Sequence, residues 1–130
     1  MERIEPRVFR ISKEELGCSQ PYLDKTKLKY FSNCEIKEIL LPVIKLENKY
    51  YLTDGHSRAF LSKSDSINVY LDKEIISSES LYEAYKVFIN WTKDLGVNNI
   101  YDLSERIINE ISFKEKWIDR CENYFQEISK

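Results

Sequence analysis

The sequence contains a single histidine and only three cysteines among its 130 residues, which leaves few groups for metal or redox chemistry. Cys18, Cys34 and Cys121 lie far apart, and no two of them have the short spacing that zinc ligands need. One histidine cannot complete a zinc site with thiols that are so scattered. We therefore expect no zinc or other metal site of this kind and no disulfide, with the cysteines present as reduced thiols.

The chain also lacks a long apolar run and an excess of charge of one sign. No apolar stretch is long enough to cross a bilayer, and the charged start, Met1 to Pro6, lacks the apolar core of a signal peptide. The 20 basic and 22 acidic residues give a net charge of −2, whereas nucleic-acid-binding domains usually present a clustered basic face. The best basic cluster, Lys25, Lys27 and Lys29, is spread around a helix. These features predict a cytoplasmic protein with no membrane partner and no nucleic-acid partner.

The N-terminal half has the patterns of a small mixed sheet. An apolar content of 42% is that of an ordinary globular protein, which at this length can bury a core without disulfides. Four segments, the middle two joined as a hairpin, are predicted to be strands: residues 7–11, 42–47, 49–53 and 67–71. Asp24 fits the N-cap of a helix that runs from Lys25 to about Phe31. Residues 34–41 fit a short helix or a strand equally well.

From Ser77 onward the apolar period changes to 3.6 residues, which predicts helices. Two capping boxes mark where helices begin, namely Ser80 with Glu83 and Ser112 with Glu115. Gly96 fits the end of the first helix, and a short helix is expected over residues 103–108. The inward faces of the two long helices are expected to carry Leu81, Ala84, Tyr85, Phe88, Trp91 and Leu95, and then Trp117, Ile118, Cys121, Tyr124, Phe125 and Ile128. We therefore expect an α+β fold, in which a core over residues 1–76 and a helical extension over residues 77–130 form one compact domain.

The most informative segment is Asp54-Gly55-His56-Ser57-Arg58-Ala59, which directly follows the apolar run Tyr50-Tyr51-Leu52. The run is typical of a strand, Gly55 of a tight turn, and residues 56–63 of the first turns of a helix. A strand that enters a helix through glycine leaves unpaired backbone N–H groups at the helix start, which suits an anion. Asp-Gly is also a strong signal for a two-residue hairpin turn, but the residues after it do not alternate as a second strand would. We therefore favour a phosphate-binding strand–turn–helix.

The side chains of this segment have alternative roles. Arg58 can bind a phosphate bidentately beside the backbone N–H groups of His56 and Ser57. It can also form a surface ion pair, with Glu47 or Asp54. His56 can donate a hydrogen bond to a phosphate or move a proton near neutral pH. Asp54 can cap the helix, hold Mg²⁺ or serve as a base, and capping is the commonest role at this place.

The hairpin and the motif after it resemble the ParB/sulfiredoxin-like superfamily over about residues 6–72. In that superfamily a hairpin followed by a glycine turn and an arginine opens a helix and forms a nucleotide phosphate site. ParB proteins carry Gly-Glu-Arg-Arg there and bind CTP, sulfiredoxins carry Gly-Cys-His-Arg and use ATP, and free-serine kinases have a motif close to Asp-Gly-His-His-Arg. Residues 54–59 and 117–121 are most similar to small uncharacterised bacterial proteins with Asp-Gly-His-Thr-Arg-Ala and Trp-Ile-x-Arg-Cys. The resemblance implies a nucleoside triphosphate, ATP or CTP, as ligand, with Mg²⁺ as a candidate companion.

Departures from the family motifs reduce the number of superfamily activities that fit this chain. The sulfiredoxin nucleophile falls at His56, which is not a cysteine, so repair of sulfinic acids is disfavoured. The loop that carries a catalytic carboxylate in the serine kinases has Gln20 here, and glutamine cannot act as a general base. The residues after Ile76, 54 of the 130, are too few for both the DNA-binding and the dimerisation domain of a ParB protein.

Two functions of different classes follow from these residues. The first is a nucleotide- or phosphate-binding protein whose C-terminal helices contact a protein partner. The second is an ATP- or ADP-dependent small-molecule kinase, similar to the free-serine kinases, or a nucleotide hydrolase. In both, a small-molecule nucleotide or another anion is bound by Gly55, His56, Ser57 and Arg58. The candidates for catalysis are Asp54 and His56, and the secondary site candidates are Ser19, Gln20, Thr53 and Arg120.

Overall fold

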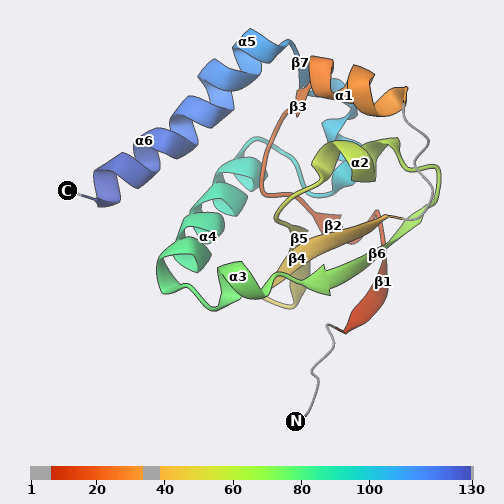
Figure 1. The fold of residues 1–130 in the computed structure, drawn as a ribbon, viewed down its shortest axis with the longest axis horizontal. Helices are drawn as coiled ribbons and strands as arrows, with labels where there is room; N and C mark the ends of the chain where they lie inside the picture. Colours follow the sequence, from red (N-terminus) through yellow and green to blue (C-terminus); the bar gives the residue numbers. More distant parts are fainter. Residues whose placement is uncertain (1–6, 34–38, 130) are drawn as a thin grey trace.

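The computed structural model describes residues 7–33 and 39–129, and its centre is a curled mixed sheet of five strands in the order β1-β6-β4-β5-β2 (Figure 1). The strands are β1 (Val8–Ser12), β2 (Leu16–Gly17), β4 (Leu40–Leu46), β5 (Lys49–Leu52) and β6 (Ser66–Leu71). Strand β4 runs antiparallel to β5 and parallel to β6. A second, two-stranded ladder joins β3 (Leu23–Asp24) to β7 (Ile107–Ile108). The α+β fold is therefore confirmed.

The helices form layers on both sides of this sheet. Along the chain they are α1 (Lys25–Ser32), α2 (His56–Leu61), α3 (Lys73–Ile76), α4 (Glu79–Asp94), the 3₁₀-helix η1 (Ile100–Glu105), α5 (Glu110–Phe113), a π-helical turn η2 (Lys114–Ile118) and α6 (Asp119–Ile128). Figure 1 shows α1 and α2 together at one end of the sheet, α4 beside the sheet, and α6 along the outer side of α4.

The central strands are buried on both faces. Leu41 and Val43 of β4 belong to the same core cluster as Ala59 of α2. Ile44 points to the opposite face, where it packs with Ile89 of α4. Because successive side chains of a strand point to opposite faces, a strand covered on both sides has a near-continuous apolar sequence. The run Leu-Leu-Pro-Val-Ile over residues 40–44 has this character.

The local patterns of the N-terminal half predicted the four longer strands and α1, but not the two-residue strands β2 and β3. Strands β4 and β5 form the expected hairpin, and both residues of its turn, Glu47 and Asn48, have positive φ angles of 51° and 69°. Positive φ at both central residues is the mark of a type I′ turn, which matches the twist of the strands. Asp24 caps α1, since its carboxylate accepts a hydrogen bond from the Thr26 N–H at 2.9 Å. Of the ambiguous segment 34–41, residues 34–38 and with them Cys34 lie outside the described residues, and Leu40 and Leu41 belong to β4.

Both expected capping boxes of the C-terminal half are wrong by two or three residues. Helix α4 is capped by Ser78, whose hydroxyl accepts from the Leu81 N–H at 3.3 Å. Helix α5 is capped by Asn109, whose side chain accepts from the Ser112 N–H at 2.8 Å. In each case another residue with a good capping side chain comes earlier in the chain and adopts the extended backbone that an N-cap needs. The short helix expected over 103–108 is instead the 3₁₀-helix η1 followed by strand β7.

Gly96 ends α4 as expected. Its φ is 87°, and the Val97 N–H donates to the Thr92 carbonyl at 3.2 Å, which is the Schellman pattern.

An aromatic cluster joins α4 to the C-terminal helices. Phe88 lies at its centre, with ring centroids 5.5–5.8 Å from those of five neighbours: Tyr85, Trp91, Trp117, Tyr124 and Phe125. Ile118 and Ile128, expected on the buried face, are 40% and 50% exposed, and Leu95 of α4 is 41% exposed. We attribute the position of Ile118 to the π-helical turn, which has more residues per turn than an α-helix and so shifts the register of the faces while Trp117 stays buried.

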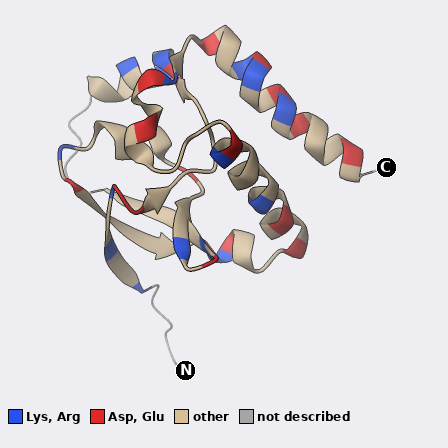
Figure 2. Cartoon of the chain, turned by 180° about the vertical axis from the view of Figure 1, so that it is seen from behind, with Lys and Arg blue, Asp and Glu red and all other residues tan. Residues whose placement is uncertain are grey.

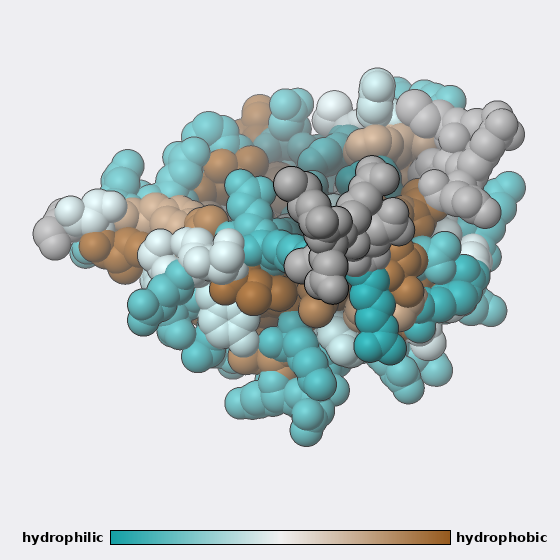
Figure 3. Space-filling view, turned by 60° about the horizontal axis from the view of Figure 1, so that its bottom comes forward, coloured by the Kyte–Doolittle hydropathy of each residue, from teal (hydrophilic) through white to brown (hydrophobic). Residues whose placement is uncertain are grey.

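The described surface is mixed in charge and in hydropathy. Figure 2 shows basic and acidic residues interspersed along α4 and the C-terminal helices. Apolar side chains reach the surface in separate patches among hydrophilic ones (Figure 3). Within residues 7–33 and 39–129, no helix is both long and apolar enough to cross a bilayer.

The close pairing of β2 with β5 generates a stability prediction. A Cβ on Gly17 would overlap the ring of Tyr51, its partner in the register. We expect Gly17→Ala to lower the free energy of unfolding by about 1–3 kcal/mol in urea denaturation, because the buried ring must move. In a Tyr51→Leu background the same substitution should cost less, since the ring is gone. An equal loss in both backgrounds would contradict this packing.

Candidate functional site

The Asp54–Arg58 segment lines a small pocket at the N-terminal end of α2. The pocket has a volume of about 150 Å³ and is lined by Gln20, Lys27, Phe31, Asp54, Gly55, His56, Ser57 and Arg58. Three parts of the chain build it: the loop before β3, helix α1, and the β5–α2 connection. The structure thus brings together the four expected phosphate-site residues, the catalytic candidate Asp54 and the secondary candidate Gln20.

Gly55 makes the connection from β5 to α2. Its φ of 81° is left-handed, and a Cβ on it would lie 2.5 Å from Cδ2 of Leu41 and 3.2 Å from Nη2 of Arg58. Glycine is therefore required both by the backbone conformation and by the close approach of neighbouring side chains. The Arg58 guanidinium folds back over this turn, so it lies at the start of its own helix.

The first turn of α2 has backbone N–H groups with no side-chain cap in the described structure. The first intrahelical hydrogen bond runs from the Ala59 N–H to the Gly55 carbonyl at 2.9 Å, and no side chain caps the helix. The Asp54 carboxylate accepts from the adjacent Gly55 N–H at 2.8 Å, so the expectation that it caps the helix is wrong. The positive φ of Gly55 separates Asp54 from the first turn. The N–H groups at this end of α2 are therefore available to an anion.

His56 connects this helix start to the loop before β3. Its Nε2 accepts a hydrogen bond from the Ser19 N–H at 3.1 Å, and the residue is 2% exposed. Burial lowers the pKa of the imidazole to about 3, with a smaller opposing effect from the Asp54 carboxylate. The ring is neutral near pH 7, so the interpretation of His56 as a proton shuttle at neutral pH is not supported by this environment. Since Nε2 accepts, the proton of the neutral ring is on Nδ1.

The Nδ1–H group of His56 is an unsatisfied buried donor. Nδ1 is a buried atom without a hydrogen-bond partner in the described part of the chain. A buried donor left unpaired costs about 1–3 kcal/mol, and such groups are rare in native structures. His56 also lines the pocket, so an acceptor bound there is one way to satisfy it.

The charged side chains that line the pocket carry a net positive charge. Lys27 and Arg58 supply two positive charges and Asp54 one negative charge. The described residues show no ion pair of Arg58 with Glu47 or Asp54, since the ion pairs among them join Lys86 to Glu83 and Lys114 to Asp119. Among these residues there is also no group of three or more metal-ligating side chains. Of the described lining residues, Asp54 is the one that offers a carboxylate for a phosphate-bound Mg²⁺.

Three secondary candidates have other roles. Ser19 contributes its backbone N–H to His56 and is itself buried. The Thr53 hydroxyl donates to Asp72 at 2.7 Å behind the pocket. Arg120 is exposed, does not line the pocket, and lies with its guanidinium carbon 3.8 Å from the ring centroid of Trp91. A cation over an aromatic face explains its position without a ligand.

Sequence reasoning missed Lys27 and Phe31. Its spacing with Lys25 and Lys29 predicts that Lys27 lies on a solvated helix surface, and Phe31 is expected only near the end of that helix. The signal that could have found them is the order of elements, because only the two-residue strand β3 separates α1 from the loop that holds Ser19 and Gln20. Helices α1 and α2 pack against each other, which brings both residues to the pocket.

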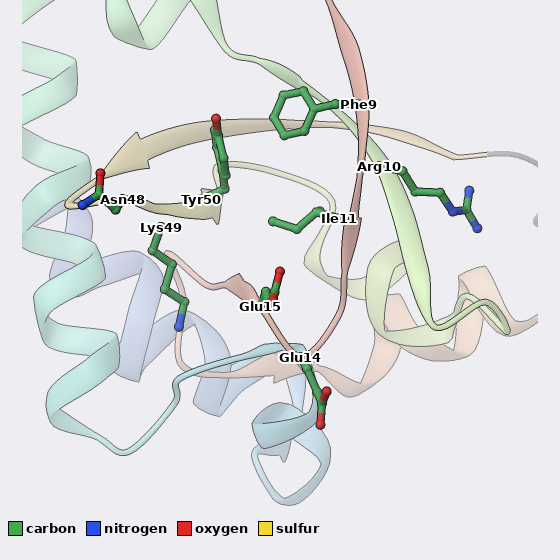
Figure 4. Close-up of a pocket in the computed structure, with 8 residues that line it drawn as sticks. All are labelled: Phe9, Arg10, Ile11, Glu14, Glu15, Asn48, Lys49 and Tyr50. Atoms are coloured by element: carbon green, nitrogen blue, oxygen red, sulfur yellow. The ribbon is translucent and has the colours of Figure 1, made fainter.

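A larger cavity of about 620 Å³ lies elsewhere, inside the curl of the sheet between β1 and β5 (Figure 4). Phe9 and Tyr50 face each other there with ring centroids 4.8 Å apart, and Ile11 completes the apolar wall. Of its basic residues, Arg10 points away from the cavity and Lys49 donates to the Asn98 carbonyl at 2.6 Å. We place the candidate site at the smaller pocket because basic side chains and unpaired donors converge there.

Comparison with known proteins supports the fold alone. No protein-family model and no curated protein matches the chain. Among solved structures it is similar to protein Atu1540 from Agrobacterium tumefaciens, with a TM-score of 0.52 and 20% sequence identity. The match covers 77% of this chain and 62% of that one, so the chain spans less than two thirds of its relative.

The burial of His56 predicts a pH-dependent stability. In the folded protein the pKa of His56 is about 3, whereas its ordinary value is 6.5. Between these values the unfolded chain binds more protons than the folded one, so acid favours unfolding. We expect this residue to lower the free energy of unfolding by up to about 1.4 kcal/mol for each pH unit below about 6.5.

Urea denaturation between about pH 7 and about pH 5 measures this effect. The matched variant is His56→Gln, whose amide oxygen can still accept the Ser19 N–H but which does not titrate. It should lose this part of the pH slope. A slope identical to that of the wild type would contradict the buried neutral imidazole.

Proposed function

We propose that the chain binds a phosphate group at the N-terminal end of α2, carried by a nucleotide such as ATP or CTP. The observation that carries this proposal is the unsatisfied Nδ1–H of His56 in a pocket that also holds Lys27 and Arg58. Phosphate oxygens accept several hydrogen bonds each, so one phosphate can satisfy this donor, the uncapped N–H groups and the guanidinium together. The resemblance to the ParB/sulfiredoxin-like superfamily supports the same ligand class.

The pocket volume sets how a nucleotide would bind. At about 150 Å³ the pocket is smaller than the roughly 300–1,000 Å³ typical of sites that enclose a whole small molecule. It suits one phosphate group, with the sugar and base outside. Phe31, which lines the pocket, offers an aromatic face on which part of the ligand can pack. We therefore expect binding energy to come mainly from the phosphate.

Arg58 is the most informative residue to change. A charge-assisted hydrogen bond contributes about 1.5–3 kcal/mol, so Arg58→Ala should weaken binding about 10- to 100-fold. Arg58→Lys should recover only part of the affinity, because an ammonium group cannot reproduce the bidentate guanidinium. Calorimetric titration with ATP, CTP and inorganic phosphate measures the change. Fold stability should change little, since the guanidinium is near the surface.

Two matched pairs provide controls for this titration. Lys27→Ala should weaken binding, whereas Lys25→Ala on the same helix should not, because Lys25 is exposed and does not line the pocket. Arg120→Gln removes an arginine that lies on the aromatic cluster and should also leave affinity unchanged. Equal affinities in the wild type and Arg58→Ala, or no binding by the wild type, would contradict the proposal.

A second candidate function is phosphoryl transfer, as a small-molecule kinase or a nucleotide hydrolase. The observation that favours it is Asp54, an exposed carboxylate and the one acidic residue that lines the pocket in the described chain. General acid–base groups contribute about 10²- to 10⁴-fold to a rate. If Asp54 acts as the base, Asp54→Asn should reduce phosphate release from ATP and Mg²⁺ by at least about 100-fold with little loss of ATP binding. Absence of release by the wild type would leave binding as the function.

A further inference from the structure

A second polar pocket lies beside β1 and β6, and Ser62 at the C-terminal end of α2 is one of its lining residues. It has a volume of about 220 Å³ and is lined by Arg10, Ile39, Ser62, Ser64, Ser66, Ile67 and Asn68. It shares no lining residue with the pocket at Gly55. Its lining contains one basic residue, three serines and no acidic residue in the described chain.

Arg10 is held in this pocket by neutral acceptors. The alternation of β1 places its side chain on the opposite face from Phe9 and Ile11, as Figure 4 shows. Its Nε donates to the Ser66 hydroxyl, and its Nη2 donates to the Ser64 hydroxyl at 2.8 Å. The bond from Nη1 to Asn68 Oδ1, its partner in the register, is longer at 3.3 Å.

These hydrogen bonds leave an excess of donors in the pocket. A guanidinium has five N–H groups, of which the three bonds use three. Each hydroxyl that accepts from Arg10 still has its own O–H to donate. The Ser62 oxygen accepts from the Ser64 N–H at 3.4 Å, which leaves its hydrogen free as well.

No carboxylate of the described residues forms an ion pair with Arg10. None of the ion pairs among residues 7–33 and 39–129 includes it. Asp65, the acidic residue of the serine-rich loop, does not line the pocket, and its carboxylate accepts from the Tyr101 hydroxyl at 3.5 Å. Among the described residues, the pocket therefore combines a positive charge with several donors and has no carboxylate to match that charge.

We propose that this pocket binds a tetrahedral oxyanion, the phosphate or sulfate group of a small ligand, through Arg10 and the hydroxyls of Ser62, Ser64 and Ser66. Such an anion offers enough acceptor lone pairs for the two remaining guanidinium hydrogens and the three hydroxyls. The serine and asparagine oxygens orient the guanidinium in advance, which reduces the entropy lost on binding. This site is separate from the one proposed at α2.

NMR titration of the ¹⁵N-labelled protein tests the proposal, because it reports each site separately. The probes are inorganic phosphate, inorganic sulfate and glycerol 3-phosphate, each compared with chloride at the same ionic strength. We expect saturable shifts of the Arg10 Nε–H signal and of the Ser64 and Ser66 amides. A higher affinity for inorganic phosphate would assign the free ion, and a higher affinity for glycerol 3-phosphate would assign an organic phosphate.

Three variants make the result decisive. Arg10→Gln should weaken binding at least about tenfold, and Arg10→Lys should weaken it less, because it keeps the charge and loses the fork. Ser64→Ala keeps Arg10 and should weaken binding several-fold. Thermal unfolding checks that each variant is folded.

The matched control is Arg7→Gln, which makes the same change in charge outside the pocket and should leave affinity unchanged. Arg58→Gln should also leave these shifts unchanged, whatever it does at α2. The proposal is overturned if chloride produces the same shifts, if the wild type gives no saturable shift, or if Arg10→Gln binds as tightly as the wild type.

Discussion

Between strand β5 and helix α2 the backbone turns through a left-handed conformation at Gly55, pressed against Leu41 of β4. The candidate site depends on this turn. It keeps the Asp54 carboxylate off the helix end, where no side chain caps α2, and leaves room for the Arg58 guanidinium beside the turn. Because β4 is buried on both faces, the turn packs against the hydrophobic core. Core packing therefore sets the position of this turn, and the loop before β3 adds Gln20 to the pocket.

His56 shows how the fold supports an unsatisfied group. Its Nε2 fixes the loop before β3 through Ser19, and burial holds the ring neutral. The same arrangement leaves Nδ1–H without a partner inside the described protein. Such a group is expected where function requires it, since its cost must be offset by packing elsewhere. A phosphate in the pocket would accept a hydrogen bond from Nδ1–H and remove the free-energy cost of the unpaired donor. This gain in binding free energy is the physical basis of the proposed function.

The sequence predicted features that depend on neighbouring residues and missed those that depend on distant ones. The hairpin, β6 and the start of α2 have clear alternation or turn signals, and all were found. The helix caps at Ser78 and Asn109 were missed because several competing capping residues stand within a few positions. Lys27 reaches the pocket only through the packing of α1 on α2, and a π-helical turn in the C-terminal helices is not visible as a period. The N–H donors of the first turn could be foreseen, but the additional unpaired donor, Nδ1–H of His56, could not, because it depends on which ring nitrogen accepts from Ser19.

A crystal structure of the protein grown or soaked with inorganic phosphate tests the central claim most directly. The account predicts a phosphate in the pocket at the start of α2, with oxygens within hydrogen-bond distance of the Ser57 N–H, the Arg58 guanidinium and His56 Nδ1. Such contacts would show that these donors act together as one anion site. A structure with phosphate bound elsewhere on the molecule and this pocket occupied only by water would contradict it.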